Sequence, residues 1–189
     1  MRRRDLVAVA GLALGLASRV HADPALLALL QRGGQVVLMR HAQTDPGVGD
    51  PERMELADCA TQRNLSEAGR AQAAAAGAAW RARQMGLERL ISSPWCRCVD
   101  TARIAFGRAP ETSPALGNLF GRGDPQGRQV AQMKALVEPP HGGNRVLVSH
   151  GSTIQALTGV YLGPAEMVVV TPQGGGRFTV AGRLPAPAR

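Results

Sequence analysis

Short segments rich in apolar residues divide the chain at regular intervals and have the length of β-strands. Continuous apolar runs of this size are typical of strands that are buried on both faces of a sheet. The final two segments instead alternate apolar and polar positions around turn glycines, which predicts a closing pair of strands. The predicted strands lie at residues 35–39, 87–92, 112–116, 145–149, 166–171 and 176–180.

Helical segments fill the intervals between most of these strands. Their starts are marked by residues that cap helices: Ser66, Ser93 before Pro94, and Asp124 before a proline. A capping box of the form Ser-x-x-Gln spans residues 152–155. The predicted helices lie at residues 25–31 and 66–85, from 94, at 124–137 and from 152, whereas residues 45–63 form a polar loop.

Strands that alternate with helices in this way predict an α/β fold with a mostly parallel central sheet flanked by helices. The chain has 189 residues, of which 44% are apolar, and this is enough to build one ordinary core. We therefore expect a single domain.

Basic and imidazole side chains follow the predicted strands directly. Arg40 and His41 end the first apolar run, and His150 ends the run at 145–149. Arg97 falls in the first turn of the helix that Ser93 is expected to cap. The carboxyl ends of parallel strands are where open α/β sheets bind their ligands, and a cationic side chain beside an imidazole suits a phosphoryl group.

The overall charge changes this picture little. The formal net charge of +8 favours anionic ligands, but aromatic residues make up only 3% of the chain. Nucleic-acid binding commonly combines basic surfaces with aromatic stacking residues, and no basic run here is interleaved with them. We expect no nucleic-acid partner.

The N-terminal residues have the pattern of an export signal. Arg2, Arg3 and Arg4 precede a weakly apolar segment at 6–17, and the small-residue pattern that ends at Ala22 predicts cleavage there. The paired arginines resemble a twin-arginine signal. A short membrane anchor is the alternative, but the apolar segment falls well short of the ~20 residues that span a bilayer. We expect residues 1–22 to be a signal peptide, residues 23–189 to be one domain in the periplasm or secreted, and no stable membrane insertion after cleavage.

Four motifs occur in order over residues 35–170: Arg40-His41-x-x-Thr44, Asn64-Leu65-Ser66-x-x-Gly69-Arg70, Ser92-Ser93-Pro94-x-x-Arg97 and Val148-Ser149-His150-Gly151. Together they resemble the histidine phosphatase superfamily, with its phosphoglycerate-mutase-like fold. An isolated Arg-His pair is common in proteins, whereas four motifs in order are specific. The sequences Cys59-x-Thr61-Gln62-Arg63-Asn64 and Trp95-Cys96-Arg97-Cys98 resemble a small exported subgroup of the superfamily.

The resemblance implies a catalytic role for each strand-end residue. His41 is the expected nucleophile and carrier of a phosphohistidine, while Arg40 and Arg97 bind the phosphoryl oxygens. His150 is the second imidazole, which donates to these oxygens and compensates charge. Thr44 and Arg63 are weaker candidates for phosphate binding. A role in fixing the loop would also explain Thr44, and an ion pair on the surface would also explain Arg63. The resemblance implies no cofactor, and we expect no metal.

The candidate proton donor is the point at which this chain departs from the family. Larger members supply an acid after the third strand, but Asn118 stands in that region and an amide cannot titrate. Asp124 is the remaining candidate, although we favour a helix cap as its role over proton donation. Family members carry an insertion after the third strand that covers the pocket. The corresponding segment here, 117–127, is short, which predicts a minimal cap over the pocket and an open pocket. We expect phosphate monoesters or activated phosphoryl groups as substrates, with activated groups preferred, carried by a small molecule, a glycolipid or a phosphoprotein.

Three cysteines in an exported chain allow one disulfide and leave one thiol. Cys59 with Cys96 or Cys98 is the expected bridge, since Cys96 and Cys98 are too close in sequence to pair well. Three free thiols or a metal site are the alternatives. Together, these features predict a metal-independent exported phosphatase, and the alternative is a non-catalytic phosphate-binding or scaffold protein of the same fold.

Overall fold

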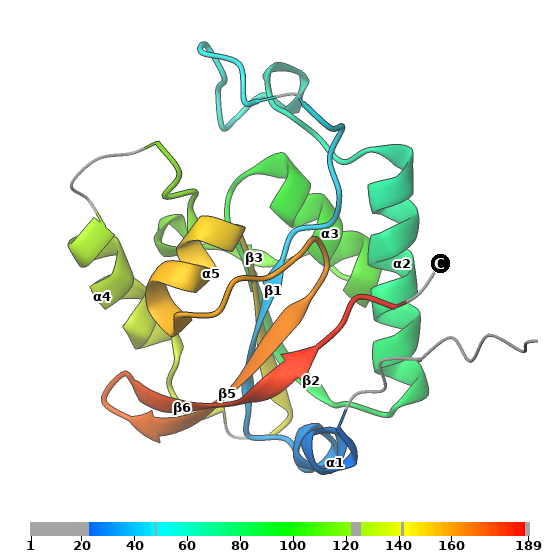
Figure 1. The fold of residues 1–189 in the computed structure, drawn as a ribbon, viewed down its shortest axis with the longest axis vertical. Helices are drawn as coiled ribbons and strands as arrows, with labels where there is room; N and C mark the ends of the chain where they lie inside the picture. Colours follow the sequence, from blue (N-terminus) through cyan, green and yellow to red (C-terminus); the bar gives the residue numbers. More distant parts are fainter. Residues whose placement is uncertain (1–22, 48, 122–125, 141, 188–189) are drawn as a thin grey trace, which may run out of the picture.

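The central element of the computed structural model is a six-stranded sheet with the order β3-β2-β4-β1-β5-β6 (Figure 1). The structure describes residues 23–47, 49–121, 126–140 and 142–187. The strands are β1 (Val36–Arg40), β2 (Leu87–Ser92), β3 (Glu111–Thr112), β4 (Asn144–Ser149), β5 (Met167–Gly174) and β6 (Arg177–Leu184).

The sheet is parallel in its first four strands and antiparallel at its other edge. β1 pairs in parallel with β4, and β2 pairs in parallel with both β4 and β3. β5 is antiparallel to β1 and to β6. The register places Arg40 beside Ser149, and the His41 amide donates to the Ser149 carbonyl at 2.9 Å. His41 and His150 therefore leave the sheet at the same edge.

Helices cover both faces of the sheet, as Figure 1 shows. Alternate residues of a strand point to opposite faces, and the core follows this rule: Val37 and Met39 pack with α1, α2 and α3, whereas Val36 and Leu38 pack with α4 and α5. The single α/β domain expected from the sequence is confirmed. The helices are α1 (Pro24–Arg32), α2 (Glu67–Ala82), α3 (Cys96–Phe106), α4 (Gln126–Leu136) and α5 (Gly151–Thr158).

Some predicted boundaries are wrong. α2 ends at Ala82 and not at Met85, because the chain turns through Gln84, whose φ is 54°. The strand expected at 112–116 is only the two-residue β3, followed by the 3-10 helix η2 (Pro114–Leu116). Pro114 has no amide hydrogen for a strand ladder and favours a turn. The loop at 45–63 contains a second 3-10 helix, η1 (Cys59–Thr61).

Two predicted helix caps are also wrong, whereas the Ser66 cap is confirmed by its 3.1 Å bond from the Gly69 amide. α3 begins after Trp95 without a side-chain cap. The Ser93 hydroxyl accepts from the Trp95 amide at 3.4 Å, ahead of the helix, and contacts His150 at 2.9 Å. α5 likewise has no side-chain cap, and Ser152 donates to Asn118. In both cases, the hydroxyl bonds to a side chain that is distant in sequence.

Two sequence predictions lie outside the described residues: the signal peptide at 1–22 and the start of the fourth helix at Asp124. Within the part of the chain that the structure describes, no helix has the length and apolar character needed to cross a bilayer.

Candidate active site

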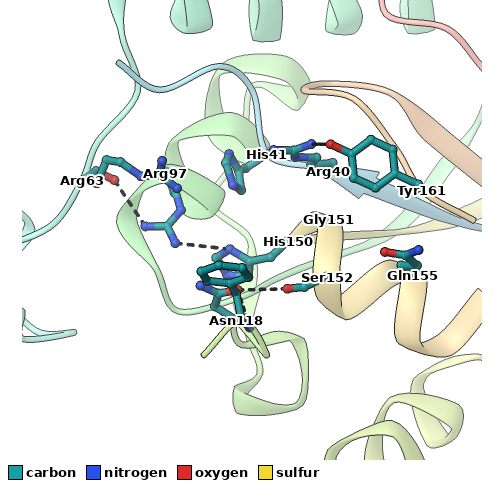
Figure 2. A pocket seen from close by; sticks show the side chains of 11 residues that line it. Arg40, His41, Arg63, Arg97, Asn118, His150, Gly151, Ser152, Gln155 and Tyr161 are labelled. Carbon is teal, nitrogen blue, oxygen red and sulfur yellow. Dashed lines mark hydrogen bonds between the residues drawn. The ribbon is translucent and has the colours of Figure 1, made fainter. Parts of the chain in front are cut away.

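A cavity of about 480 Å³ opens at the carboxyl ends of β1 and β4 (Figure 2). It brings together two imidazoles and three guanidinium groups from four separate parts of the chain. Arg40 and His41 come from the end of β1, Arg97 from α3, and His150 from the end of β4. The cavity is lined by Arg40, His41, Arg63, Arg97, Asn118, Phe120, His150, Gly151, Ser152, Gln155 and Tyr161.

His41 is held as a neutral imidazole with a defined tautomer. Its Nδ1 lies 2.8 Å from the Ala42 carbonyl oxygen, which can only accept a hydrogen bond, so Nδ1 carries the proton and Nε2 the lone pair. Burial lowers the pKa of His41 to about 3, the bond to Ala42 opposes this shift, and nearby positive charges, chiefly Arg97, lower the pKa further. Near neutral pH, His41 is therefore a neutral imidazole whose Nε2 carries a lone pair.

His150 lies edge-on to His41, with ring centroids 5.4 Å apart. Its Nδ1 lies 3.4 Å from Arg97 Nη2, and a guanidinium can only donate, so this nitrogen accepts. In the neutral ring, Nε2 then carries the proton and donates to the Ser93 hydroxyl at 2.9 Å. Burial, followed by the charge of a protonated His41, lowers the pKa of His150 well below its usual value. Donation from Nδ1 to a phosphoryl oxygen therefore requires His150 to gain a second proton.

Arg40 extends from the end of β1 along the wall formed by Gly151. Its Nη1 donates to the Leu162 carbonyl at 2.8 Å and reaches the Tyr161 hydroxyl at 3.4 Å (Figure 2). A Cβ at Gly151 would approach the Arg40 Nε to 3.3 Å. Among the described residues, that Nε has no hydrogen-bond partner. A buried donor of this kind is available to a ligand oxygen.

Arg97 is the most deeply buried cation of the site. Its side chain is fully buried and forms two bonds to the Asp50 carboxylate, of 2.6 and 2.9 Å. Arg97 Nη1 also donates to the Arg63 carbonyl at 3.3 Å. Figure 2 shows the guanidinium between Arg63 and His150. The sequence predicted the place of Arg97 in the first turn of α3, which holds although the helix starts at Cys96.

The two weaker phosphate-binding candidates differ. Arg63 lines the cavity, and burial, followed by the charge of Arg97, lowers its pKa. Thr44 is not among the lining residues; its backbone forms a bridge with Leu65 that closes the loop after β1. The structure thus brings Arg63, but not Thr44, to the cavity.

Asn118 lines the cavity where an acid was expected. Its Oδ1 accepts from the Ser152 hydroxyl at 3.1 Å (Figure 2). The same oxygen accepts from the Phe120 amide at 3.1 Å. Of the lining residues, all of which are described, none is a carboxylic acid. Asp124, the other candidate proton donor, lies outside the described residues.

The cysteines connect the loop after β1 to the helix that carries Arg97. Cys59 and Cys96 form a disulfide, and Cys98 is a buried free thiol. The Cys98 sulfur lies 3.5 Å from His150 Nε2. Burial raises the pKa of Cys98 to about 12, so the thiol stays protonated and is a poor nucleophile. Within the described residues, no group of three or more His, Cys, Asp or Glu side chains is arranged to hold a metal ion.

Sequence reasoning missed several residues of the site. Asp50 has no local pattern that points to Arg97, which lies 47 residues later. Tyr161 and Phe120 were also missed. Their one signal in the sequence is that aromatic residues are scarce: Tyr161 is the single tyrosine of the chain. Tyr161 is 62% exposed and Phe120 is 81% exposed, and both border the cavity.

Comparisons with known proteins agree with this geometry. A family model described as the histidine phosphatase superfamily (branch 1) matches residues 36–121. This range contains Arg40, His41 and Arg97. A search of curated proteins found no match.

Solved structures of phosphatases share the fold at low sequence identity. The protein histidine phosphatase SixA, in complex with tungstate, is 18% identical with a TM-score of 0.61, over 80% of this chain and 97% of SixA. A mycobacterial glucosyl-3-phosphoglycerate phosphatase with bound VO3 is 22% identical with a TM-score of 0.58, over 82% of this chain and 100% of that one. Phosphoserine phosphatase from Entamoeba histolytica is 16% identical with a TM-score of 0.57, over 79% and 95% of the two chains.

Proposed function

We propose that this chain, whose residues 36–121 match the model of the histidine phosphatase superfamily (branch 1), is a member of that superfamily and an exported, metal-independent phosphatase that acts through a phosphohistidine on His41. The observation that carries the proposal is the oriented, neutral imidazole of His41. Its Nε2 lone pair faces no competing proton, since Nδ1–H is bonded to the Ala42 carbonyl. It shares a cavity with three guanidinium groups, which suit a phosphoryl dianion.

The reaction proceeds in two displacements. His41 Nε2 attacks phosphorus while the bond to the leaving group breaks, which gives a phosphohistidine and the leaving group with its electron pair. Water then attacks phosphorus, the Nε2–P bond breaks, and inorganic phosphate departs with the oxygen of that water. Charge on the transferring group is neutralised by Arg40 and Arg97, whose buried Nε donors are available. His150, once protonated on Nδ1, donates to the same oxygens.

The substrate class follows from whether the site holds an acid that can protonate the leaving group. Without an acid among the lining residues, leaving groups that need little protonation react best. Activated phosphoryl groups, such as aryl phosphates, phosphoramidates and acyl phosphates, fit this condition. The exposed Phe120 and Tyr161 rings at the cavity offer surface to a bulky leaving group. A small molecule, a glycolipid head group and a phosphoprotein are all compatible with such a rim.

Export is supported by two features of the chain. Residues 1–22 have the composition of a cleaved signal, and the Cys59–Cys96 disulfide is typical of oxidising compartments such as the periplasm. The mass of the protein recovered outside the cytoplasm tests this. A chain that starts at Asp23 is the expected product, and an uncleaved cytoplasmic chain would contradict export.

The His41→Ala variant tests the catalytic proposal. It is expected to abolish hydrolysis of 4-nitrophenyl phosphate and to leave the fold unchanged by circular dichroism. Orthovanadate is expected to inhibit the unmodified enzyme by competing for the same cavity. Unchanged turnover in the variant would exclude the phosphohistidine route. Phosphate binding without any turnover in the unmodified protein would instead indicate a binding or scaffold protein of the same fold.

A further inference from the structure

Asp50 lies in the loop between β1 and α2 and holds one edge of the Arg97 guanidinium. Its Oδ1 accepts from Nη1 at 2.6 Å and its Oδ2 accepts from Nη2 at 2.9 Å. The Asp50 side chain is 21% exposed, whereas that of Arg97 is fully buried. The carboxylate therefore occupies the end of the guanidinium, where the two Nη atoms form a fork.

The remaining donors of Arg97 lie on its two side edges, one formed by Nη1 and the other by Nε with Nη2. Nη1 also donates to the Arg63 carbonyl at 3.3 Å, and Nη2 reaches His150 Nδ1 at 3.4 Å. Nε is buried and has no hydrogen-bond partner among the described residues. Nε and Nη2 together form the second of these edges, and a buried donor left without a partner is costly. This edge is therefore suited to an anionic oxygen.

We propose that Asp50 is a positioning residue, which fixes the end of the Arg97 guanidinium so that its side edge, Nε with Nη2, receives the phosphoryl group. This inference rests on the proposed function, since it assigns Arg97 to a phosphoryl ligand. Asp50 also supplies the negative charge that a fully buried guanidinium requires near Arg40 and Arg63, because a buried charge without compensation is strongly unfavourable.

The loop that carries Asp50 is tied to the start of α3 beside Arg97. Cys59 is joined to Cys96, the residue before Arg97. The Gln62 side chain accepts from the Cys96 amide at 2.9 Å, and the Arg63 carbonyl accepts from Arg97 itself. These links fix the C-terminal part of the loop, whereas Asp50 binds Arg97 from the N-terminal part of the same loop. Two separate segments of the loop therefore contact Arg97 or the residue before it.

A competing interpretation makes the opposite prediction. If the Asp50 carboxylate imitated a phosphate and had to leave before a substrate could bind, its removal would strengthen phosphate binding. If Asp50 positions Arg97, its removal weakens phosphate binding. Inorganic phosphate measured by calorimetry therefore separates the two, and this measurement needs no turnover. A failure of the proposed catalytic function would appear separately, as absent hydrolysis by the unmodified protein.

The test compares Asp50→Asn, Asp50→Glu and the control Glu52→Gln, which removes a charge from an exposed position in the same loop. Asp50→Asn is expected to raise the Kd for phosphate on the order of tenfold and to lower kcat/KM for 4-nitrophenyl phosphate by about 10²-fold, with kcat itself reduced. Asp50→Glu, which keeps the charge but shifts the carboxylate, is expected to show an intermediate loss. Glu52→Gln is expected to match the unmodified protein.

The outcome that overturns the proposal is an unchanged or lower Kd for phosphate in Asp50→Asn. Should this variant not fold, Asp50→Glu decides by the same criterion, since it retains the negative charge beside Arg97. A loss confined to KM, with kcat unchanged and no recovery in Asp50→Glu, would also contradict positioning of the transferring group.

Discussion

The two sides of the cavity are built in different ways. On the strand side, Arg40, His41 and His150 follow buried strands, and the pairing of β1 with β4 fixes where they emerge. On the loop side, Asp50 and Arg63 belong to a segment whose described residues contain one short helix, the 3-10 helix η1. The hydrophobic core thus positions His41, the proposed nucleophile, whereas the Asp50–Arg97 ion pair and a disulfide position the groups around Arg97.

This difference has an energetic basis. Strand residues such as Val37 and Leu38 are fully buried, and burial of apolar surface is the dominant stabilising contribution in folding. Most residues between 45 and 61 are exposed, including Leu56 at 43%. The loop therefore gains little from the hydrophobic effect and depends on specific bonds, which makes it the side that single substitutions disturb with the least harm to the fold.

The largest expected effect is a difference in lost activity between a substitution on the strand side and one on the loop side. His150→Asn is expected to lower kcat/KM for 4-nitrophenyl phosphate by about 10³-fold, because it removes the imidazole that compensates charge in the transition state. Arg63→Gln, which also leaves an amide, is expected to cost only about tenfold, because Arg63 is a partly exposed cation at the loop side. Steady-state kinetics with both variants checks this, and equal losses would remove the distinction between the sides.

The disulfide offers a way to disturb the loop side alone. Replacement of Cys59 and Cys96 by alanine is expected to lower the free energy of unfolding by about 3 kcal/mol, because the bridge closes a long loop in the unfolded chain. Urea denaturation measures the change. Phosphate affinity is expected to fall as well, whereas the His41 environment, observed by NMR of the imidazole, is expected to stay the same.

Cys98→Ala serves as the matched control for the disulfide. This residue lies in the same turn of α3 but is a free thiol, so its loss leaves the loop tethered. Thiol counting under denaturing, non-reducing conditions is expected to find one reactive thiol in the unmodified protein. Three reactive thiols, or equal destabilisation by both sets of substitutions, would contradict a structural role for the bridge.

The sequence allowed prediction of the strand side because its signals are local. The apolar run before Arg40 and the run before His150 each predict a strand, and parallel pairing brings their ends together. Ser93 and Ser152 were assigned to caps because a serine before a helix usually bonds to the backbone. In the structure neither caps its helix, although Ser93 accepts from the Trp95 amide at 3.4 Å, and their side-chain partners are His150 and Asn118, 57 and 34 residues away. Contacts between such distant side chains leave no periodic pattern in the chain.

Leaving-group preference tests whether the loop side or the short segment after η2 supplies an acid. Without an acid at the leaving group, kcat/KM for 4-nitrophenyl phosphate is expected to exceed that for a sugar phosphate by about 10²-fold. Steady-state kinetics on both substrates measures the ratio. Equal rates would indicate that a protein acid protonates the leaving group, and Asp124→Asn would then show whether that acid is Asp124.

The smallest expected effect is a dependence of stability on pH, which arises from His41 on the strand side. Burial lowers the pKa of His41 from 6.5 to about 3. Below pH 6.5 the unfolded chain binds a proton at His41 that the folded chain does not bind, so acid favours unfolding. The contribution of His41 is fully present above pH 6.5 and is lost by about 1.4 kcal/mol per pH unit as the pH falls toward 3.

Burial also lowers the pKa of His150, so its contribution has the same sign. Urea denaturation at pH 7 and pH 5, with His41→Gln as reference, isolates the His41 contribution. Between these pH values the unmodified protein is expected to lose about 2 kcal/mol more of its free energy of unfolding than His41→Gln. Equal losses in the two proteins would show that the fold does not hold His41 neutral, and the strand side would then lack the deprotonated nucleophile on which the proposed mechanism depends.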